Sequence, residues 1–285
     1  MHIAGRLNMK PWEREKLIIE RTKEPITRDR IVEDLEEIGV KHGDILFVHS
    51  SMSKIGWIVG GVATVINALM EAVGEEGTLM MPGESSGNGE PSHWRYPAVP
   101  ESWWEIIRRE IPPFDPKTTP TRGIGKIPEA FRSFPGVLRS QHPQVSFQAW
   151  GKNAEYLVKN HPLERPLGEE SPLDRFYELK GKILLLGVGH DINTSIHLAE
   201  DKAKIPDFPT IEKGAAILMK GKRVWVTWTE LLYDSDDFDM IGEAYEKSNS
   251  YTLGHIGQAE SKLIEARSLV DFAIEWMRKN RHYGK

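Results

Sequence analysis

The sequence predicts an α/β protein with a mainly parallel central sheet, and three features of the residue pattern lead to this fold class. Short apolar runs rich in β-forming residues, typical of buried strands, occur at 44–48, 77–81 and 182–188. A helical pattern lies between the first two runs, and this strand–loop–helix–strand order implies a right-handed parallel crossover. Further along, a turn at 220–222 separates two strand-like runs, which predicts a β-hairpin region.

The composition is that of a globular enzyme-sized chain. With 285 residues, 39% of them hydrophobic, we expect one domain over 26–285 and a charged peripheral arm over 1–25. The absence of cysteine excludes disulfides and thiolate nucleophiles. The net charge of -5 and the lack of a basic cluster argue against nucleic-acid binding. Because no apolar run is long enough to span a membrane and residues 1–16 do not resemble a signal peptide, we expect a cytoplasmic protein.

The individual elements follow from apolar spacing and from helix signals. Thr27 is a predicted helix N-cap, Gly39 ends that helix, and Gly60 with Gly61 opens the helix of the crossover. In chain order we expect a helix at 12–21, a helix at 27–39, a strand at 44–48, a helix from 62, a strand at 77–81, helices at 101–110 and 127–133, strands at 145–149 and 182–188, hairpin strands at 215–219 and 223–227, and a terminal amphipathic helix at 260–278.

The first candidate site lies where the strand at 44–48 ends. Hydroxyls and free backbone N–H groups beside a helix opened by two glycines suit a pyrophosphate, because the N–H groups and the helix dipole favour anions. The residues concerned are His49, Ser50, Ser51, Met52, Gly60 and Gly61. A purely structural loop stays an open alternative, since the pattern matches neither the P-loop nor the spacing of GxGxxG.

The second candidate site follows the run at 182–188, which has the strongest buried-strand pattern in the sequence. Its residues are His190, Asp191, Asn193, His197 and Glu200. A helix capped by Asn193 or Thr194 would place His197 in its first turn and Glu200 three residues on, on the same face. These side chains suit acid–base chemistry. Metal binding and a structural core histidine are the alternatives, although the spacing does not match HExxH.

The third candidate site is the loop Thr121-Arg122-Gly123, followed further on by Arg139. An arginine beside hydroxyls and glycines can bind phosphate through two parallel hydrogen bonds. The same composition is typical of an irregular loop, so both interpretations stay open.

Together and in this order, the three segments resemble the aminoglycoside 3-N-acetyltransferase family. The matching segments are GDILFVHSSMSKIGWIVGGVATVINALMEAVGEEGTLMMP (43–82), FDPKTTPTRGIGKIPEAFRSFPGVLRSQHP (114–143) and GEESPLDRFYELKGKILLLGVGHDINTSIHLAE (168–200). The resemblance extends from Ile26 to the C-terminus and includes the spacing between the segments. It implies a three-layer α/β/α fold, distinct from the GNAT acetyltransferase fold.

The resemblance also implies a co-substrate, a substrate and site residues. It places acetyl-CoA beside the 49–52 segment, the glycines at 60 and 61 and the 121–123 loop, and it matches the 190–200 segment to the catalytic segment of the family. The implied substrate is a polyamine sugar, an aminoglycoside acetylated on the 3-amino group of 2-deoxystreptamine. No metal, nucleic acid or membrane is implied, and a homodimer is one option.

Acetylation of an amine requires a base, because an aliphatic amine is mostly protonated at pH 7. We expect His197 to be this base, with His190 as the alternative and Asp191 or Glu200 as the carboxylate that orients the ring. Backbone N–H groups at 50–52 are candidates for stabilising the oxyanion. Without cysteine, direct attack of the amine is favoured over an acyl-enzyme, with Ser50 as an open nucleophile.

Two features bear on the substrate, and three other functions are kept as alternatives. An acidic run at 234–239 could bind a polycation or be a solvated turn. After Met81-Pro82, many members of the family continue with a threonine and an aromatic residue, whereas this chain has Gly83-Glu84. The alternatives are an N-acetyltransferase of the same fold for a metabolic amine, a CoA-binding protein without catalysis, and a zinc hydrolase.

Overall fold

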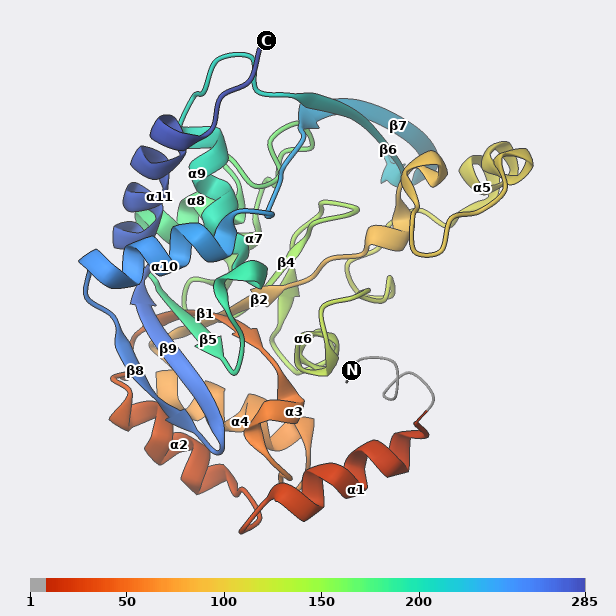
Figure 1. Cartoon of the computed structure of the whole chain (residues 1–285). Coiled ribbons are helices and arrows are strands. Elements are labelled where there is room, and N and C mark those ends of the chain that lie inside the picture. The colour runs from red at the N-terminus through yellow and green to blue at the C-terminus, as the bar shows by residue number, and fades with distance from the viewer. Residues whose placement is uncertain (1–8, 285) are drawn as a thin grey trace.

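The computed structural model describes residues 9–284, which form a central sheet of seven strands and a separate two-stranded hairpin (Figure 1). In the order in which they lie side by side, the strands of the central sheet are β3 (Leu138–Arg139), β4 (Phe147–Gly151), β2 (Thr78–Pro82), β1 (Ile45–Ser50), β5 (Lys182–Leu186), β9 (Ala259–Glu265) and β8 (Thr252–Ile256). The predicted parallel pairing of β1 with β2 is present, and β1 also pairs in parallel with β5, a pairing that was not predicted.

The predicted α/β class is confirmed, but the prediction of a mainly parallel sheet is wrong. Within the described residues, the pairs β2·β4, β3·β4, β5·β9 and β8·β9 are antiparallel, so only the three central strands run parallel. The strands β8 and β9 are joined by a two-residue turn, and such a short connection permits antiparallel pairing alone.

Helices cover both faces of the sheet, as the three-layer fold requires. One face carries α2 (Arg28–Glu37), α4 (Val62–Val73) and α6 (Lys126–Phe131), with the short α3 (Met52–Ile55) beside them. The other face carries α7 (Ala154–Val158), α8 (Pro172–Glu178), α9 (His197–Lys202), α10 (Phe238–Ser248) and α11 (Ala266–Asn280). Each layer closes its own hydrophobic core, and Figure 1 shows α2 and α4 on the side of the sheet opposite α9 and α11.

Strand alternation explains how β1 serves both cores. Leu46 and Val48 pack into the core under α2 and α4, whereas Phe47 packs into the core under α8 and α11. His49 follows Phe47 on the second face, and the centroids of the two rings are 4.5 Å apart. The sequence thereby aims His49 at the layer that contains α9.

The N-terminal arm contains the predicted helix, observed as α1 (Pro11–Arg21) with no buried residue. The predicted N-cap of α2 is confirmed, because the Thr27 hydroxyl accepts a hydrogen bond from the Arg30 N–H. Residues 1–8 of the arm lie outside the described residues. The division of the chain into an arm over 1–25 and one domain over 26–285 stays a prediction.

The predicted hairpin is confirmed and is longer than expected. It consists of β6 (Thr210–Met219) and β7 (Lys222–Leu231), paired without interruption. In Figure 1 it lies at the edge of the molecule beside α5 (Trp104–Glu110). The guanidinium of Arg223 on β7 donates to the carbonyls of Arg108 and Ile111 at the end of α5, so the two segments form one projecting unit.

The predicted start of the C-terminal helix is wrong. The predicted helix at 260–278 begins only at Ala266, and the residues before it form β9, the strand between β5 and β8. The sequence signal is weak there because Glu260, Lys262 and Glu265 are good helix formers, and only pairing on both sides makes the segment a strand. Among the described residues, no helix is both long and apolar enough to cross a membrane.

Candidate active site

The histidines of the first two predicted sites come together at the carboxyl ends of the parallel strands. His49 and Ser50 end β1, Glu84 comes two residues after β2, and the segment with His190 and His197 follows β5. In α/β sheets, ligands bind at this edge because the loops from neighbouring strands meet there. The sheet order β2-β1-β5 therefore brings together side chains that are up to 148 residues apart in the chain.

The helix α9 presents His197 and Glu200 to each other. The Asn193 side chain accepts a hydrogen bond from the Ser195 N–H, which confirms a predicted cap and leads through a 3-10 turn into α9, with His197 as its first residue. Nδ1 of His197 donates to Oε2 of Glu200 over 2.5 Å. Phe238 and Tyr233 pack against the imidazole in edge-to-face geometry, with centroids 4.7 and 5.6 Å away. The ring plane is thus fixed.

The Glu200 carboxylate is itself held by further donors. Its Oε1 accepts hydrogen bonds from Nη1 of Arg281 over 2.6 Å and from the Asp234 N–H over 2.9 Å. The side chain of Glu200 is fully buried, and Arg281 lies just beyond the end of α11. Arg281 was not predicted, because 81 residues separate it from Glu200 and no local pattern connects them.

His190 is sealed on both ring nitrogens. Its Nε2 donates to Oε1 of Glu246 over 2.9 Å, and its Nδ1 accepts from the Asn193 amide at 3.4 Å. Burial lowers the pKa of His190, and the hydrogen bond to Glu246 only partly opposes this effect. Lys262 also pairs with Glu246. Glu246 comes from α10 and was not predicted. His190 is a buried, neutral ring whose two nitrogens both have hydrogen-bond partners within the protein.

Asp191 does not orient either histidine in this structure. It is exposed, and its backbone N–H donates to the Asp239 carboxylate. Within residues 9–284, no hydrogen bond joins the Asp191 side chain to an imidazole. The structure brings Glu200 to His197 but leaves Asp191 at the surface.

His49 and Glu84 are the other titratable side chains near His197. Burial, together with the nearby His190 and His197, lowers the pKa of His49 to about 3, so this ring is neutral at physiological pH. Its Nε2 is buried without a hydrogen-bond partner among the described residues. Burial raises the pKa of the Glu84 carboxyl, and the nearby His197 opposes this rise. Glu84 was not a predicted site residue.

The other residues of the first candidate site surround the start of α4 and the end of β1. The Ser51 N–H donates to the Leu186 carbonyl, which removes it from the candidates for oxyanion binding, and the Ser50 hydroxyl is buried without a partner in the part of the chain that the structure describes. Met52 begins α3. Gly60 and Gly61 have positive φ angles of 78° and 65°, a backbone conformation that favours glycine.

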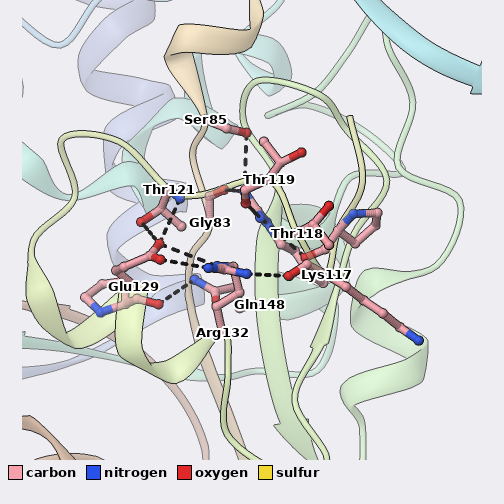
Figure 2. A network of polar contacts seen from close by, with 12 residues as sticks. Gly83, Ser85, Lys117, Thr118, Thr119, Thr121, Glu129, Arg132 and Gln148 are labelled. Carbon is pink, nitrogen blue, oxygen red and sulfur yellow. Dashed lines mark hydrogen bonds and ion pairs between the residues drawn. The ribbon is translucent and has the colours of Figure 1, made fainter. Parts of the chain in front are cut away.

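The 121–123 loop is positioned by Glu129 and by the segment after β2. Oε2 of Glu129 accepts hydrogen bonds from both the N–H and the hydroxyl of Thr121, and Glu129 also pairs with Arg132 (Figure 2). The Arg122 N–H donates to the Glu84 carbonyl, whereas the Arg122 side chain and Gly123 are exposed. The loop therefore lies against the residue that neighbours His197.

Arg139 is an architectural residue and not a phosphate ligand. Its guanidinium is buried and donates to the carbonyls of Gly83 and Thr119 and to the hydroxyls of Ser85 and Ser146. Burial lowers the pKa of Arg139 to about 10, which leaves it charged at neutral pH. Gly83 and Ser85 follow β2, Thr119 lies between α5 and α6, and Ser146 precedes β4, so Arg139 ties three loops together.

The acidic run at 234–239 is largely engaged within the protein. The Asp237 carboxylate accepts two hydrogen bonds from Arg281, and Asp239 accepts from the Asp191 N–H. Asp236 is exposed. In residues 9–284, no group of three or more His, Cys, Asp or Glu side chains is arranged to hold a metal ion.

Comparison with known proteins gives consistent matches over most of the chain. The family model for aminoglycoside 3-N-acetyltransferase matches residues 47–278. The SPbeta prophage-derived aminoglycoside N(3')-acetyltransferase-like protein YokD of Bacillus subtilis is 44% identical, over 93% of this chain and 97% of YokD. Aminoglycoside N(3)-acetyltransferase VII of Streptomyces paromomycinus is 35% identical, over 92% of this chain and 95% of the relative.

Solved structures agree with the fold. The crystal structure of YokD superposes with a TM-score of 0.91 over 93% of this chain and 98% of that chain. The structure of AAC-IIIb with CoASH has a TM-score of 0.82 at 31% identity, and that of AAC-VIa with sisomicin has 0.83 at 32%, each covering 92% of this chain and 100% of the other. This chain therefore belongs to the aminoglycoside 3-N-acetyltransferase family, an acyltransferase family.

Proposed function

We propose that the protein transfers the acetyl group of acetyl-CoA to the 3-amino group of the 2-deoxystreptamine ring of an aminoglycoside, with His197 as general base. Family membership supports the reaction class. Two relatives of the same fold bind the two kinds of molecule that such a reaction needs, since AAC-IIIb has been solved with CoASH and AAC-VIa with sisomicin. The identity of the base rests on the geometry of this chain.

The observation that carries the proposal is the asymmetry of the His197 ring. Nδ1 is committed to Glu200, whereas Nε2 has no hydrogen-bond partner among the described residues, and the side chain is 17% exposed. His190 offers no such nitrogen, because Glu246 and Asn193 occupy both of its ring positions. A base needs a lone pair that the substrate can reach, and His197 meets this condition.

Three groups of the chain take part in the proposed acetyl transfer: His197, Glu200 and the Met52 N–H. Nε2 of His197 accepts the proton that the attacking amine loses, and Glu200 holds the imidazole in orientation and stabilises the imidazolium that forms. Proton transfer by a positioned side chain contributes about 100- to 10,000-fold in rate. The Ser51 N–H is bound to the Leu186 carbonyl and is not available to the oxyanion. Of the predicted oxyanion donors, we therefore assign this role to the Met52 N–H at the start of α3.

The surroundings of β1 fit acetyl-CoA, which supplies the activated acetyl group as a thioester. Gly61 is the N-cap of α4 and provides no side-chain cap, so the first backbone N–H groups of this 12-residue helix are available to a pyrophosphate. Arg122 adds an exposed cation on the loop beside Glu84. These residues would bind the cofactor nucleotide and orient its acyl end toward His197.

A second candidate substrate is a different, non-antibiotic amine, and the Glu84 position favours it. This half-buried carboxyl neighbours His197 in the segment where the chain departs from the residues expected after Met81-Pro82. A carboxyl in the substrate pocket selects amines by their positive charge and by the distance of that charge from the reacting nitrogen. The reaction and the base would be the same.

The test is a thiol-release assay with acetyl-CoA against a panel of 2-deoxystreptamine aminoglycosides and simple primary amines. We expect turnover with aminoglycosides, NMR of the product showing acetylation at N3, and loss of turnover in a His197→Gln variant. Inactivity with every aminoglycoside but turnover with another amine would favour the second candidate. A His197→Gln variant as active as the wild type would remove the proposed base.

A further inference from the structure

Arg281 stands between the end of α11 and two carboxylates. Its Nη1 donates to Oε1 of Glu200 over 2.6 Å, while Nε and Nη2 donate to the two carboxylate oxygens of Asp237 over 2.7 and 2.5 Å. Nη2 also donates to the Asp234 carbonyl. The guanidinium is only 7% exposed, so these contacts are shielded from solvent.

We propose that Arg281 is a positioning residue for the reaction, which fixes the Glu200 carboxylate in the orientation that presents Nε2 of His197 to the substrate. The inference rests on the proposed function for its catalytic consequence, but the geometry that it describes belongs to the resting protein. Residue 281 lies beyond the 47–278 segment that the family model matches. The match itself therefore gives no role to this arginine.

The two oxygens of the Glu200 carboxylate have different partners. Oε2 accepts from His197, and Oε1 accepts from Arg281 and from the Asp234 N–H. A fully buried carboxylate needs such partners, because an unpaired charge in the interior is strongly unfavourable. Without Arg281, Oε1 keeps a single neutral donor, and the carboxylate is free to rotate away from Nδ1 of His197. The ring then loses its fixed direction.

Asp237 explains why an arginine stands at this position. The planar fork of the guanidinium binds both Asp237 oxygens with Nε and Nη2 and still directs Nη1 at Glu200. Although burial opposes the charged form, the hydrogen bonds that Arg281 donates to Asp237 and Glu200 raise the pKa of Arg281. A lysine has one nitrogen and no fixed fork, so it can neutralise Glu200 but cannot hold the same direction.

A role confined to anchoring the C-terminal segment would have a different outcome. It predicts that loss of Arg281 lowers the stability of the fold while the folded enzyme keeps its kcat. The positioning role predicts a fall in kcat at nearly constant KM, since Arg281 contacts the group behind the base and not the bound amine.

The first experiment compares Arg281→Gln with Arg278→Gln as the matched control. Arg278 lies at the same helix end, where it donates to the Ala203 carbonyl and pairs with Glu275, and the structure shows no contact between it and Glu200 in the described residues. We expect kcat to fall about 10- to 100-fold in Arg281→Gln at a KM within about twofold of wild type. Arg281→Lys should restore part of kcat. A folded Arg281→Gln enzyme with wild-type kcat would overturn the proposal.

The second experiment uses no substrate and separates this inference from the proposed function. The ¹⁵N chemical shifts of the His197 ring report its tautomer in the resting protein. We expect Nδ1–H alone in wild type and in Arg278→Gln, and a mixture of tautomers in Arg281→Gln. A changed tautomer in a protein that acetylates no aminoglycoside would refute the proposed substrate but retain the positioning role. An unchanged tautomer would overturn it.

Asp237→Asn keeps the test decisive if Arg281→Gln does not fold. This variant leaves the Arg281–Glu200 pair intact and weakens the second anchor of the guanidinium. We expect a smaller fall in kcat, about three- to tenfold, with a partial change of the His197 tautomer. Wild-type kcat and a wild-type tautomer in folded Asp237→Asn would count against the proposal.

Discussion

The buried arginines Arg139 and Arg281 show how similar polar clusters serve different ends. Arg139 donates to carbonyls and hydroxyls of three loops, and every group it touches is neutral. Arg281 touches two carboxylates, one of which holds His197. The hydrogen bonds of Arg139 join only groups of the protein. The hydrogen bonds of Arg281 lead through Glu200 to His197, whose Nε2 has no partner among the described residues.

The pKa shifts follow the same division. Burial without a carboxylate lowers the pKa of Arg139, while hydrogen bonds to Asp237 and Glu200 outweigh burial and raise that of Arg281. A buried charge therefore does not identify a catalytic site by itself. The difference lies in whether the cluster leaves a reactive atom that a substrate can reach, as it does at Nε2 of His197.

The largest expected effect concerns stability and separates the two clusters. Replacement of Arg139 by methionine removes the donor of the Thr119 carbonyl and one of the two donors of the Gly83 carbonyl, which keeps its hydrogen bond from the Ser146 hydroxyl. The bonds to the Ser85 and Ser146 hydroxyls are lost as well, so we expect the free energy of unfolding to fall by about 3–5 kcal/mol. The matched variant His197→Gln should lose less than about 1 kcal/mol, because its ring is partly exposed and its Nε2 bonds to no described residue.

Urea denaturation at pH 7 measures both values, and circular dichroism at zero denaturant checks that each variant is folded. Equal losses in the two variants would show that the His197 cluster is as architectural as the Arg139 network. A stable Arg139→Met protein would show that water replaces the lost donors.

The next effect is a loss of stability in mild acid, shared by the site and the scaffold. His161 belongs to the scaffold, where its buried ring bonds to the Ser140 hydroxyl and the Pro166 carbonyl. Burial lowers the pKa of His49 and of His161 to about 3, below the value of about 6.5 in an unfolded chain. Between these values the unfolded chain binds protons that the folded chain does not, so stability decreases as the pH falls. Each ring should remove about 2 kcal/mol between pH 7 and pH 5.

The measurement is the free energy of unfolding of wild type and of His49→Gln at pH 7 and pH 5. The variant lacks one of the two rings and should lose about 2 kcal/mol less than wild type over this interval. An identical loss in both proteins would mean that His49 is protonated in the folded state, in conflict with its burial against Phe47.

A smaller effect is expected at Glu129, which belongs to the network of Figure 2. Burial opposes its charged form, but hydrogen bonds from Arg132 and Thr121 outweigh burial and lower the pKa of Glu129 to about 2. Its contribution to stability is complete above about pH 4.5 and is lost as the pH falls toward 2. Because the side chain is 39% exposed, we expect Glu129→Gln to lose only about 1–2 kcal/mol at pH 7.

Thermal unfolding of Glu129→Gln and wild type between pH 7 and pH 3 tests this value. The difference in Tm should be constant down to about pH 5 and should shrink below it, at lower pH than the histidine effect. A difference that is independent of pH would assign the loss to altered packing and not to the charge.

The local parts of the site could be predicted from the sequence, and its distant parts could not. The i, i+3 spacing of His197 and Glu200 and the cap at Asn193 follow from helix geometry, and both are observed. Arg281 and Glu246 come from segments 81 and 56 residues away from their partners, so no periodicity points to them. Only the packing of α10 and α11 on the sheet brings them to the site.

The fold shows the same limit. The apolar runs of β1, β2 and β5 identify the three parallel strands, because strands buried on both faces have continuous apolar sequences. In the flanking strand β9, charged residues interrupt the apolar ones, and the segment becomes a strand only through pairing with β5 and β8. A strand defined by its neighbours leaves little signal in its own residues.

The smallest expected effect concerns Asp236, an exposed member of the acidic run. The carboxylates of Asp234, Asp237 and Asp239 accept hydrogen bonds from the Asp236 N–H, Arg281 and the Asp191 N–H. Among the described residues, the Asp236 carboxylate has no such partner, so it is the one left to attract a polycation as the sequence suggested. We expect Asp236→Asn to change stability by less than about 0.5 kcal/mol and to lower kcat/KM for a polycationic substrate less than about twofold at low salt, with no difference at 0.5 M salt, since screening weakens exposed charges. Steady-state kinetics at two ionic strengths measure this. A larger effect that persists at high salt would place Asp236 in direct contact with the substrate, and the acidic run would then join the reactive cluster of His197 instead of the surface around it.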